Sequence, residues 1–494
     1  MICINKERRV FLIMLRSFLA ILLVAFGQAI FAFESQPPNI VLIFADDLGY
    51  GDLSCFGSET IRTPNLDQLA QQGRKFTSFM VASPVCTPSR AALLTGCYPK
   101  RIGMHQGVLF PNSTKGLNPT ETTIADHLKA KGYATACFGK WHLGHHPEVL
   151  PKFQGFDTYF GIPYSNDMNY PDNNHRPPGG PAGMDLLWNA PESALTKWKT
   201  PLFENDRLVE LPVDQRTITR RCTQKAIDFV NANREKPFFV YLPYSMPHIP
   251  LYVPDDVRDP DPKKAYINTV EHVDSEIGRL LETLEQNSLA ENTFVIFASD
   301  NGPWLQFKHH GGSAGPLRDG KGTTFEGGQR VPCIIRGPGI QAGTVCHELT
   351  GTIDVLPTLA SLTKSPLPDD SKIDGMDMSE LWLGTISKSP RAEFLYYSSQ
   401  GVVEGLRQGK WKLLIKKRAE SNQQAKEPSE SQQKSLPPEL LLFDLESDLG
   451  EKNNLAATHP DLVTLLRSRL EEMDADITRN ARTPWQKPSA KTAP

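Results

Sequence analysis

Four short apolar runs, each followed at once by charged or amide side chains, constrain the fold of this sequence more than any other feature. The runs occupy residues 39–45, 133–138, 237–242 and 293–298. Their length and their β-branched and aromatic residues are typical of strands buried on both faces of a sheet. Helical patterns lie between them, and this alternation predicts an α/β fold with a large, mostly parallel central sheet flanked by helices.

Further elements fit the same layered arrangement. Helices are expected at 65–73, 122–131, 214–232 and 274–286, and another strand at 76–81. The composition changes near Pro366, after which shorter runs joined by turns predict an antiparallel sheet. A smaller C-terminal α+β domain is therefore expected at 366–494, with a polar segment at 416–439 and a final helix at 460–477.

The polar side chains that follow the four apolar runs are expected to lie together. In a parallel sheet the carboxyl ends of the strands meet at one edge. One such group is equally well explained as a solvated turn, but four of them make coincidence a poor explanation. The residues are Asp46, Asp47, Lys140, His142, His248, Asp300 and Asn301.

Three carboxylates in this set indicate a bound cation. Asp46, Asp47 and Asp300 cannot share a partly buried site unless they are protonated or meet positive charge. With Asn301 they form an all-oxygen set, which selects a hard ion and disfavours zinc. Ca²⁺ tolerates an irregular carboxylate cage better than Mg²⁺, so Ca²⁺ is expected and Mg²⁺ remains open.

The stretch SPVCTPSRAALLTG places a cysteine at the start of a helix. Pro88 suits a first helical position, so Cys86 is expected just outside the helix, facing its free N–H groups. These donors favour an anion, and Arg90 adds a fixed positive charge one turn further on. The alternative is a buried cysteine before an ordinary helix, and the Pro, Ser and Arg at these offsets make it weaker.

Basic side chains are expected to surround the cation. Such a density of positive charge suits a tetrahedral oxyanion whose charge grows at the bridging oxygen during bond cleavage. The glycine-rich stretch at 309–330 lacks a nucleotide-binding motif, and its glycines suit a loop that approaches the site closely. The basic residues are Arg90, Lys140, His142, His248 and Lys321.

A long segment with little periodicity, 163–212, is expected to shape a substrate pocket. Ser165 in this segment is a candidate hydrogen-bonding residue. Trp188, Trp198 and the His309–His310 pair are candidates for contacts with a sugar ring, with packing or surface roles as the alternative.

The N-terminal sequence indicates the location of the protein, and its charge balance limits the classes of ligand it can bind. Basic residues, a short apolar run and small residues predict a cleavable signal peptide at 1–32, with a retained membrane anchor as the alternative. No later segment is apolar enough to span a membrane. The net charge of −3 and the mixture of signs give no basic stripe for nucleic acid. Signal removal leaves seven cysteines, an odd count that hints at one free or modified thiol.

The order DDLG, CTPSR, GKWHLG, PYSND, MPH, SDNG and GKGTTFEGG resembles the arylsulfatase A group of the type I sulfatases, in the alkaline phosphatase superfamily. The resemblance covers nearly all of the mature chain and makes 37–365 the catalytic domain. FDLESDLGEKNNLA, at 443–456, resembles the C-terminal domain of these enzymes. The core positions show no departure from the pattern.

The resemblance implies that a formylglycine-generating enzyme converts Cys86 to formylglycine, whose hydrate attacks sulfur through one hydroxyl and expels sulfate with the other. It implies that Ca²⁺ is bound by residue 86 together with Asp46, Asp47, Asp300 and Asn301. It assigns stabilisation of the hydrate to Arg90 and Lys140, and the sulfate oxygens to Lys140, His248 and Lys321. His142 would be the base, His248 the acid for the departing alcohol, and Ser165 an assisting residue.

The expected function is that of an exported sulfatase that hydrolyses aryl sulfates or sulfated carbohydrates to an alcohol and inorganic sulfate. One alternative is a phosphate or phosphonate ester hydrolase of the same superfamily. Two-zinc phosphatases need additional Asp and His ligands and usually a Thr or Ser nucleophile, which disfavours this alternative. The other is a secreted protein that holds a sulfated glycan without cleaving it, for which a missing core residue would be expected.

Overall fold

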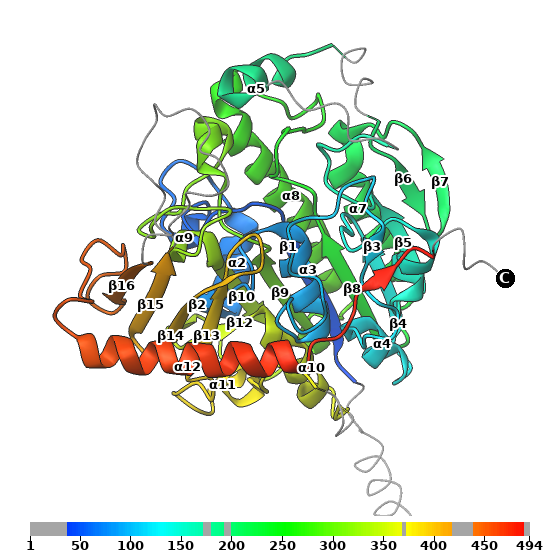
Figure 1. Ribbon diagram of the computed structural model, residues 1–494. Coiled ribbons are helices and arrows are strands. Elements are labelled where there is room, and N and C mark those ends of the chain that lie inside the picture. The colour runs from blue at the N-terminus through cyan, green and yellow to red at the C-terminus, as the bar shows by residue number, and fades with distance from the viewer. Residues whose placement is uncertain (1–36, 171–178, 192–198, 368–371, 417–437, 489–494) are drawn as a thin grey trace, which may run out of the picture. The chain divides into compact units, whose positions relative to one another are not determined.

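The structure, a computed structural model, describes residues 37–170, 179–191, 199–367, 372–416 and 438–488 (Figure 1). Within the chain, Asn39–Pro494 is one compact unit. The expected signal peptide at 1–32, Trp198 and almost all of the polar segment at 416–439 lie outside the described residues. The domain boundary at residue 366 stays a prediction.

The large sheet contains the four predicted strands as direct neighbours. Its strand order is β11-β2-β10-β9-β1-β8-β4-β5-β6-β7, with β12 beside β2. The bounds are β1 Asn39–Ala45, β2 Arg74–Met80, β4 Ala134–Phe138, β5 Thr158–Gly161, β6 Leu202–Glu204, β7 Arg207–Glu210, β8 Phe238–Pro243, β9 Thr293–Ser299, β10 Arg330–Arg336, β11 Thr344–Cys346 and β12 Thr350–Gly351. Strands β9, β1, β8, β4 and β5 run parallel, whereas β10 is antiparallel to both neighbours and β6 and β7 extend the sheet in antiparallel fashion. The prediction of a large, mostly parallel sheet is confirmed.

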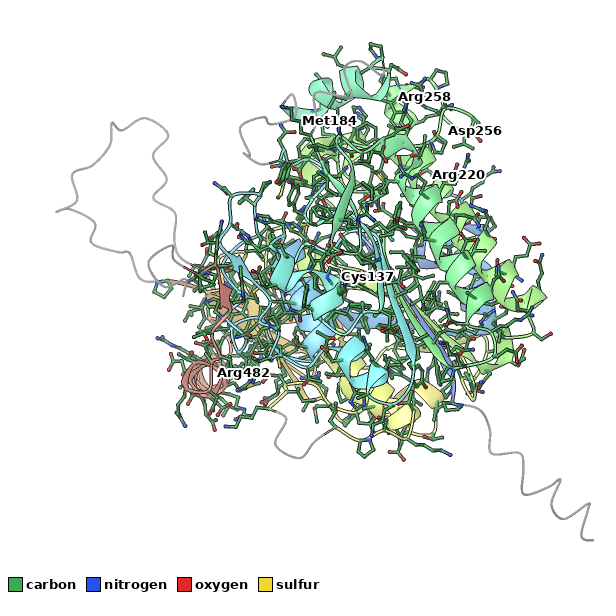
Figure 2. All side chains as sticks on the ribbon, turned by 90° about the vertical axis from the view of Figure 1, so that its right-hand side faces the viewer. Cys137, Met184, Arg220, Asp256, Arg258 and Arg482 are labelled. Carbon is green, nitrogen blue, oxygen red and sulfur yellow. The ribbon has the colours of Figure 1, made fainter. Side chains whose placement is uncertain are left out.

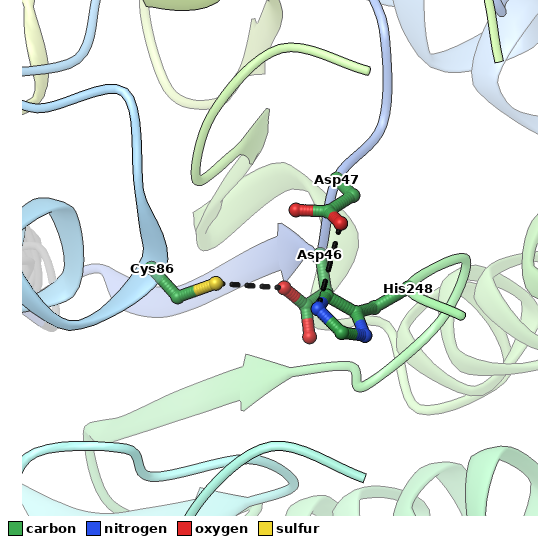
Figure 3. A group of neighbouring side chains, drawn as sticks. All are labelled: Asp46, Asp47, Cys86 and His248. Carbon is green, nitrogen blue, oxygen red and sulfur yellow. Dashed lines mark hydrogen bonds and ion pairs between the residues drawn. The ribbon is translucent and has the colours of Figure 1, made fainter. Parts of the chain in front are cut away.

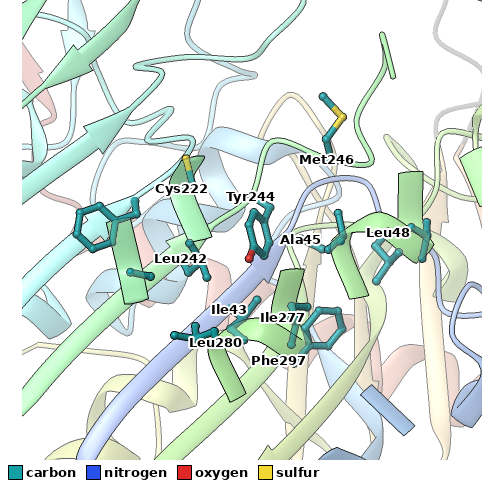
Figure 4. Packing of buried hydrophobic residues seen from close by; sticks show 14 of the residues in the cluster. Ile43, Ala45, Leu48, Cys222, Leu242, Tyr244, Met246, Ile277, Leu280 and Phe297 are labelled. Atoms are coloured by element: carbon teal, nitrogen blue, oxygen red, sulfur yellow. The ribbon is translucent and has the colours of Figure 1, made fainter. Parts of the chain in front are cut away.

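Strand β1 shows why the predicted runs are apolar throughout. Val41 and Ile43 point into one core and Leu42 and Phe44 into another, because successive side chains of a strand alternate between its faces. Figure 4 shows part of the first core, where Ile43 lies near Ile277 of the long helix α8. All these side chains are shielded from water, so each stabilises the layered fold by its buried apolar area.

Helices cover both faces of this sheet (Figure 1). The first core contains side chains of α2 (Pro64–Gln72), α5 (Gly180–Trp188), α7 (Gln215–Ala232) and α8 (Ala265–Gln286). The second contains side chains of α3 (Cys86–Thr95), α4 (Ile124–Lys129), α10 (Val355–Leu362) and α11 (Ser379–Leu383). Among the described residues there are also the helices α9 (Glu326–Gln329) and α12 (Pro460–Arg479), with 3₁₀ helices η1 Ser54–Phe56, η2 Pro147–Val149, η3 Pro151–Phe153, η4 Pro262–Lys264, η5 Ala290–Asn292, η6 Leu305–His310 and η7 Thr352–Asp354.

The start of α3 differs from the prediction. Cys86, expected just outside the helix, is its first residue, and Val85 is the N-cap. The N–H of Ser89 bonds the carbonyl of Val85 at 3.2 Å and closes the first turn. Pro88 lies inside this turn, where its missing N–H has no helical partner to lose, so the proline does not mark the first helical residue.

Two further predictions need correction. The helix expected at 274–286 begins at Ala265, because Tyr266 and Val270 continue its buried face. The segment 163–212, expected to be irregular, contains α5 and the β6–β7 pair. Its many prolines and glycines hid these elements, which are too short to give a clear apolar repeat.

The second sheet is antiparallel, as predicted. It has the order β13-β14-β15-β16, with bounds Glu393–Tyr397, Val403–Gln408, Trp411–Lys416 and Glu439–Asp444. Helix α12 buries Leu466 and Leu470 in the same core, which also receives Tyr98 from the first half of the chain. A third, two-stranded sheet pairs β3 (Lys115–Gly116) with β17 (Trp485–Gln486).

The described cysteines carry no disulfide: Cys55, Cys86, Cys97, Cys137, Cys222, Cys333 and Cys346 are all free. Figure 2 shows Cys137 in the interior, where it fills space in the second core. No helix in the described parts of the chain has the length and apolar character needed to cross a bilayer.

Candidate active site

The ends of four adjacent parallel strands form the candidate active site. Because β9, β1, β8 and β4 are neighbours in this order, the residues that follow them meet at one edge of the large sheet. Figure 3 shows part of the site, with Cys86 Sγ lying 3.6 Å from Asp46 Oδ1 and His248 Nε2 lying 3.6 Å from Asp47 Oδ2. The structure brings Asp46, Asp47 and His248 together with Cys86.

Asp46 is held by two basic side chains. Lys140 Nζ donates to Asp46 Oδ2 at 2.6 Å, and Arg90 Nη2 lies 3.4 Å from Asp46 Oδ1. Burial alone would raise the pKa of Asp46, but the charges of Lys140, His248 and Arg90 outweigh burial and lower it. The Asp46 carboxylate is therefore ionised beside the Cys86 thiol.

Asp300 and Arg90 form a fully buried ion pair. Both Nε and Nη2 of Arg90 donate to Asp300 Oδ2, at 3.0 and 2.8 Å. The other oxygen of Asp300 accepts the N–H of Asp47 at 3.1 Å. Burial and the nearby charge of Asp46 raise the pKa of Asp300, against the opposing effect of Arg90. Arg90 therefore balances two carboxylates at once.

Asp47 is the third carboxylate and lies between an amide and an ammonium group. Its backbone has φ 61°, a left-handed conformation, and Asn301 Nδ2 donates to its Oδ1 at 2.7 Å. Lys321 Nζ donates to its Oδ2 at 2.8 Å. Each carboxylate thus has a basic partner, so the balance of charge alone does not require a metal.

The surroundings of the amide oxygen of Asn301 point to a bound metal ion. Asn301 Oδ1 is buried and has no hydrogen-bond partner among the described residues. An unpaired buried polar oxygen is costly, so such an atom calls for a ligand. Asn301 bonds Asp47 through its amide nitrogen and directly follows Asp300, and the oxygen donors of these residues together with Asp46 are of the type that fits a hard divalent cation. The buried group formed by Asp46, Asp47, Cys86 and His248 is also close enough to hold an ion.

Cys86 is buried, with 1% of its surface exposed. Burial raises the pKa of its thiol well above the ordinary value, and the opposing effects of Lys140 and Lys321 do not compensate. An unmodified Cys86 is therefore a neutral thiol and a weak nucleophile at neutral pH, because the thiolate is the reactive form.

Lys140 and His248 face the site from neighbouring strands and share Ser165. Lys140 Nζ donates to Ser165 Oγ at 3.2 Å, and Ser165 Oγ lies 3.5 Å from His248 Nε2. His248 Nδ1 lies 2.5 Å from the carbonyl oxygen of Ile249 and 3.1 Å from Asn166 Oδ1. A proton on Nδ1 satisfies these acceptors, which leaves Nε2 directed at Asp47 and Ser165.

His142 lies at the same strand end and is held in a left-handed conformation, with φ 59°. Its Nε2 lies 3.0 Å from the carbonyl oxygen of Leu109, and its own carbonyl accepts from Thr87 Oγ1 at 2.9 Å. Its Nδ1 is buried without a partner among the described residues. Burial, with Lys140 and Arg90, lowers the pKa of His142 well below its ordinary value, so its imidazole is neutral.

Sequence reasoning missed Trp304 and Asn166. The ring of Trp304 lies 4.2 Å from Lys321 Nζ, and its centroid lies 5.5 Å from that of the His248 ring. Asn166 orients His248, as described above. Both follow predicted site residues closely in the sequence, Trp304 in SDNGPW and Asn166 in PYSND, and this adjacency was the available signal.

Among the candidates for sugar contacts, Trp188 and the His309–His310 pair have hydrogen-bond partners within the protein, and Trp198 lies outside the described residues. Trp188 is 5% exposed and donates its Nε1–H to the carbonyl of Asp259 at 2.8 Å, which favours the packing alternative. His309 and His310 instead bond Asp185.

Comparisons with known proteins show which proteins this chain is similar to. A family model described as "Sulfatase" matches residues 38–365. Arylsulfatase A from Homo sapiens is 40% identical over 474 residues, which cover 90% of this chain and 90% of the relative. Arylsulfatase G from Rattus norvegicus is 35% identical over 468 residues, which cover 90% of this chain and 87% of the relative. The solved structure of Ps i-CgsB in complex with k-i-k-neocarrahexaose matches with a TM-score of 0.72 at 31% identity, covering 92% of this chain and 96% of that one.

Buried carboxylates and basic groups gather around one side chain at the carboxyl edge of the sheet, an arrangement suited to the hydrolysis of an oxyanion ester. The family match covers well over half of the chain, and the relatives match along nearly its whole length. The chain belongs to the sulfatase family and is a sulfuric ester hydrolase.

Proposed function

We propose that this chain is an exported sulfatase in which residue 86, as formylglycine, and a Ca²⁺ ion act together on sulfated carbohydrates or aryl sulfates. The observation that carries the proposal is the position of Cys86 Sγ, 3.6 Å from Asp46 Oδ1 within a ring of basic side chains. As formylglycine, residue 86 would supply a hydroxyl nucleophile toward sulfur in place of a buried, protonated thiol.

Asp46, Asp47, Asp300 and Asn301 would hold the ion, and the unpaired Asn301 Oδ1 supports this set. The all-oxygen donors favour Ca²⁺ over Mg²⁺. A divalent cation there would offset the carboxylate charge and stabilise negative charge on the substrate.

Two lysines are placed to hold the sulfate group. Lys140 and Lys321 donate to Asp46 and Asp47, and burial opposes their charge. The neighbouring carboxylates nevertheless raise the pKa of each lysine, so both stay ammonium groups at neutral pH. If a cation engaged the carboxylates, Lys140 and Lys321 could donate to the oxygens of a sulfate ester, where negative charge develops during cleavage.

The two histidines have matching roles as base and acid. His142 is neutral, and if its Nε2–H donates to Leu109, its unpartnered Nδ1 carries the free lone pair that a base needs. His248 keeps Nε2 directed toward the site because Asn166 and Ile249 occupy Nδ1. Protonated at Nε2, His248 would donate to the leaving alcohol, and Ser165 would position both His248 and Lys140.

Mass spectrometry of the peptide that contains residue 86, combined with turnover of an aryl sulfate, tests the nucleophile. We expect the aldehyde in place of the thiol, no turnover in Cys86→Ala, and normal turnover in Cys346→Ala, which removes a buried cysteine of β11, an edge strand of the large sheet. Active protein with a wholly unmodified thiol at residue 86 would contradict the proposal.

The substrate class is proposed as sulfated carbohydrates, since Ps i-CgsB, similar along 92% of this chain, was solved with a carrahexaose. A panel of sulfated mono- and oligosaccharides, an aryl sulfate and the matching aryl phosphate separates the possibilities. We expect kcat/KM for sulfate esters to exceed that for the phosphate. A preference for the phosphate or a phosphonate would instead favour a phosphate or phosphonate ester hydrolase. Binding of sulfated sugars without turnover would favour a non-catalytic protein that binds sulfated glycans.

The proposal of export rests on the N-terminal signal pattern alone and is tested by N-terminal sequencing of the mature protein.

A further inference from the structure

A second group of metal-ligating side chains lies between α5 and η6. His309 Nε2 lies 2.7 Å from Asp185 Oδ1, and His310 Nε2 lies 2.9 Å from the same oxygen. The ligand atoms of the three residues all lie within 4.8 Å of one another. The side chains of Asp185 and His309 are 34% and 31% exposed, whereas that of His310 is 1% exposed. The group is therefore anchored in the protein and reachable from solvent.

The backbone brings two successive histidines to one carboxylate. Lys308, directly before them, has φ 53° and ψ −116°, which breaks the regular course of η6. This conformation is costly for any residue other than glycine. The centroids of the His309 and His310 rings consequently lie 4.5 Å apart, with both Nε2 atoms on Asp185. Strain of this kind persists only where the surrounding structure holds it, so the convergence is a built feature of the loop.

The donor atoms suit a transition metal. Two imidazole nitrogens and one carboxylate oxygen are ligands that Zn²⁺ prefers, whereas Ca²⁺ requires oxygen ligands. Zinc ligands lie about 2.0–2.1 Å from the ion, which puts tetrahedral donors about 3.3 Å apart. The observed hydrogen bonds would need to lengthen by only about half an ångström to admit the ion. Among the described residues Asp185 forms ion pairs only with these two histidines, so no lysine or arginine competes there.

The geometry points to a divalent transition-metal site of the Zn²⁺ class, formed by Asp185, His309 and His310, with a remaining coordination position for water. It differs in donor type from the oxygen-rich cage at the strand ends. A bound ion would cross-link α5 to the loop that follows β9, because coordination bonds would replace two hydrogen bonds. The same loop carries Trp304, so the cross-link would steady one wall of the active site.

Titration of the purified mature protein with Zn²⁺ tests this inference by isothermal calorimetry. Ca²⁺ is present in excess to fill the oxygen cage, the proposed site formed by Asp46, Asp47, Asp300 and Asn301. We expect one equivalent of Zn²⁺ to bind the wild type. Asp185→Asn and His309→Ala should each weaken this binding by more than about 100-fold, because each removes one of three protein ligands. Co²⁺ in place of Zn²⁺ should give visible ligand-field bands that both variants lose.

Two controls distinguish binding at this site from binding at another histidine and from unfolding of the variant. His347→Ala removes another exposed histidine, which bonds Thr77, and should bind Zn²⁺ as the wild type does. An unchanged melting temperature of Asp185→Asn without metal shows that the variant is folded. Full Zn²⁺ binding by both Asp185→Asn and His309→Ala would show that the ion binds elsewhere and would overturn the inference. A wild type that binds no Zn²⁺ would also overturn it, and the three residues would then only form hydrogen bonds. The readout is binding rather than turnover, so neither result bears on the proposed function.

Discussion

Arg90 donates both Nε and Nη2 to a single oxygen of Asp300, at 3.0 and 2.8 Å, with both side chains fully buried. The pair joins the first turns of α3, which begins at residue 86, to the end of β9, next to Asn301. A buried charge without its partner is costly, so the two residues hold each other in place. One ion pair thereby links the helix that carries Cys86 to the strand end that carries Asp300 and Asn301.

Replacing Arg90 by Lys tests this relationship. The ammonium keeps the charge but cannot donate twice to Asp300, so we expect kcat/KM to fall by more than about 100-fold and the free energy of unfolding to fall by about 1–3 kcal/mol. Steady-state kinetics and urea denaturation measure both. Arg467→Lys alters an exposed pair with Glu471 and should change neither. Wild-type kinetics in Arg90→Lys would show that the double hydrogen bond from the Arg90 guanidinium to Asp300 does not determine the geometry of the active site.

Removing the unpaired amide oxygen of Asn301 tests the oxygen cage. In Asn301→Ala we expect the Ca²⁺ concentration that raises the melting temperature to increase at least about tenfold, because one ligand is lost. Thermal denaturation over a Ca²⁺ series measures this effect, and a parallel Mg²⁺ series should give a smaller shift in the wild type. Chelation should abolish turnover, and readdition of Ca²⁺ should restore it. An identical Ca²⁺ response in the variant and the wild type would remove Asn301 from the ligand set.

Trp304 is expected to position Lys321 and to face the leaving alcohol. Its ring is 4.2 Å from Lys321 Nζ, within the range of a cation–π interaction. Trp304→Ala should raise KM for ring-shaped sulfate esters more than for a small alkyl sulfate, and Trp304→Phe should recover most of the loss because it keeps an aromatic face. Kinetics on both substrates measure the difference. Equal losses on the two substrates would limit Trp304 to a structural role.

Asp52, a buried carboxyl group outside the proposed set of site residues, provides a further pH dependence. It accepts hydrogen bonds from Gly49 N, Tyr266 Oη and Ser313 N, yet burial raises its pKa from 3.8 to about 6. Between pH 4 and 6 the unfolded chain ionises Asp52 while the folded protein keeps it protonated, so the native state binds more protons there. Its contribution to stability is complete below about pH 4 and is lost as the pH rises through about 6, by about 3 kcal/mol.

Comparison of the wild type with Asp52→Asn isolates this effect. The free energy of unfolding of the wild type relative to the variant should fall as the pH rises from about 4 to 6 and stay level above that range. Urea denaturation at a series of pH values measures the difference. A difference that is flat across the whole range would mean that Asp52 ionises normally in the folded protein.

Much of the fold could be read from local patterns. A strand buried on both faces must be apolar at every position, and a parallel sheet must place its strand ends at one edge, so Asp46, His248 and Asp300 could be brought together without coordinates. The CTPSR and GKWHLG strings then supplied Arg90 and Lys140. These features are local in sequence, or follow from rules of sheet topology that hold for any chain.

Other features depend on which distant side chains meet, and no local pattern records that. The pairing of Arg90 with Asp300, the Trp304 ring over Lys321 and the convergence of His309 and His310 on Asp185 are contacts between segments far apart or across a strained turn. Their energies arise from burial and geometry in the folded state, where the removal of water makes an unpaired charge or oxygen costly. The residue types were visible in the chain, but only the packing of its layers decided their partners.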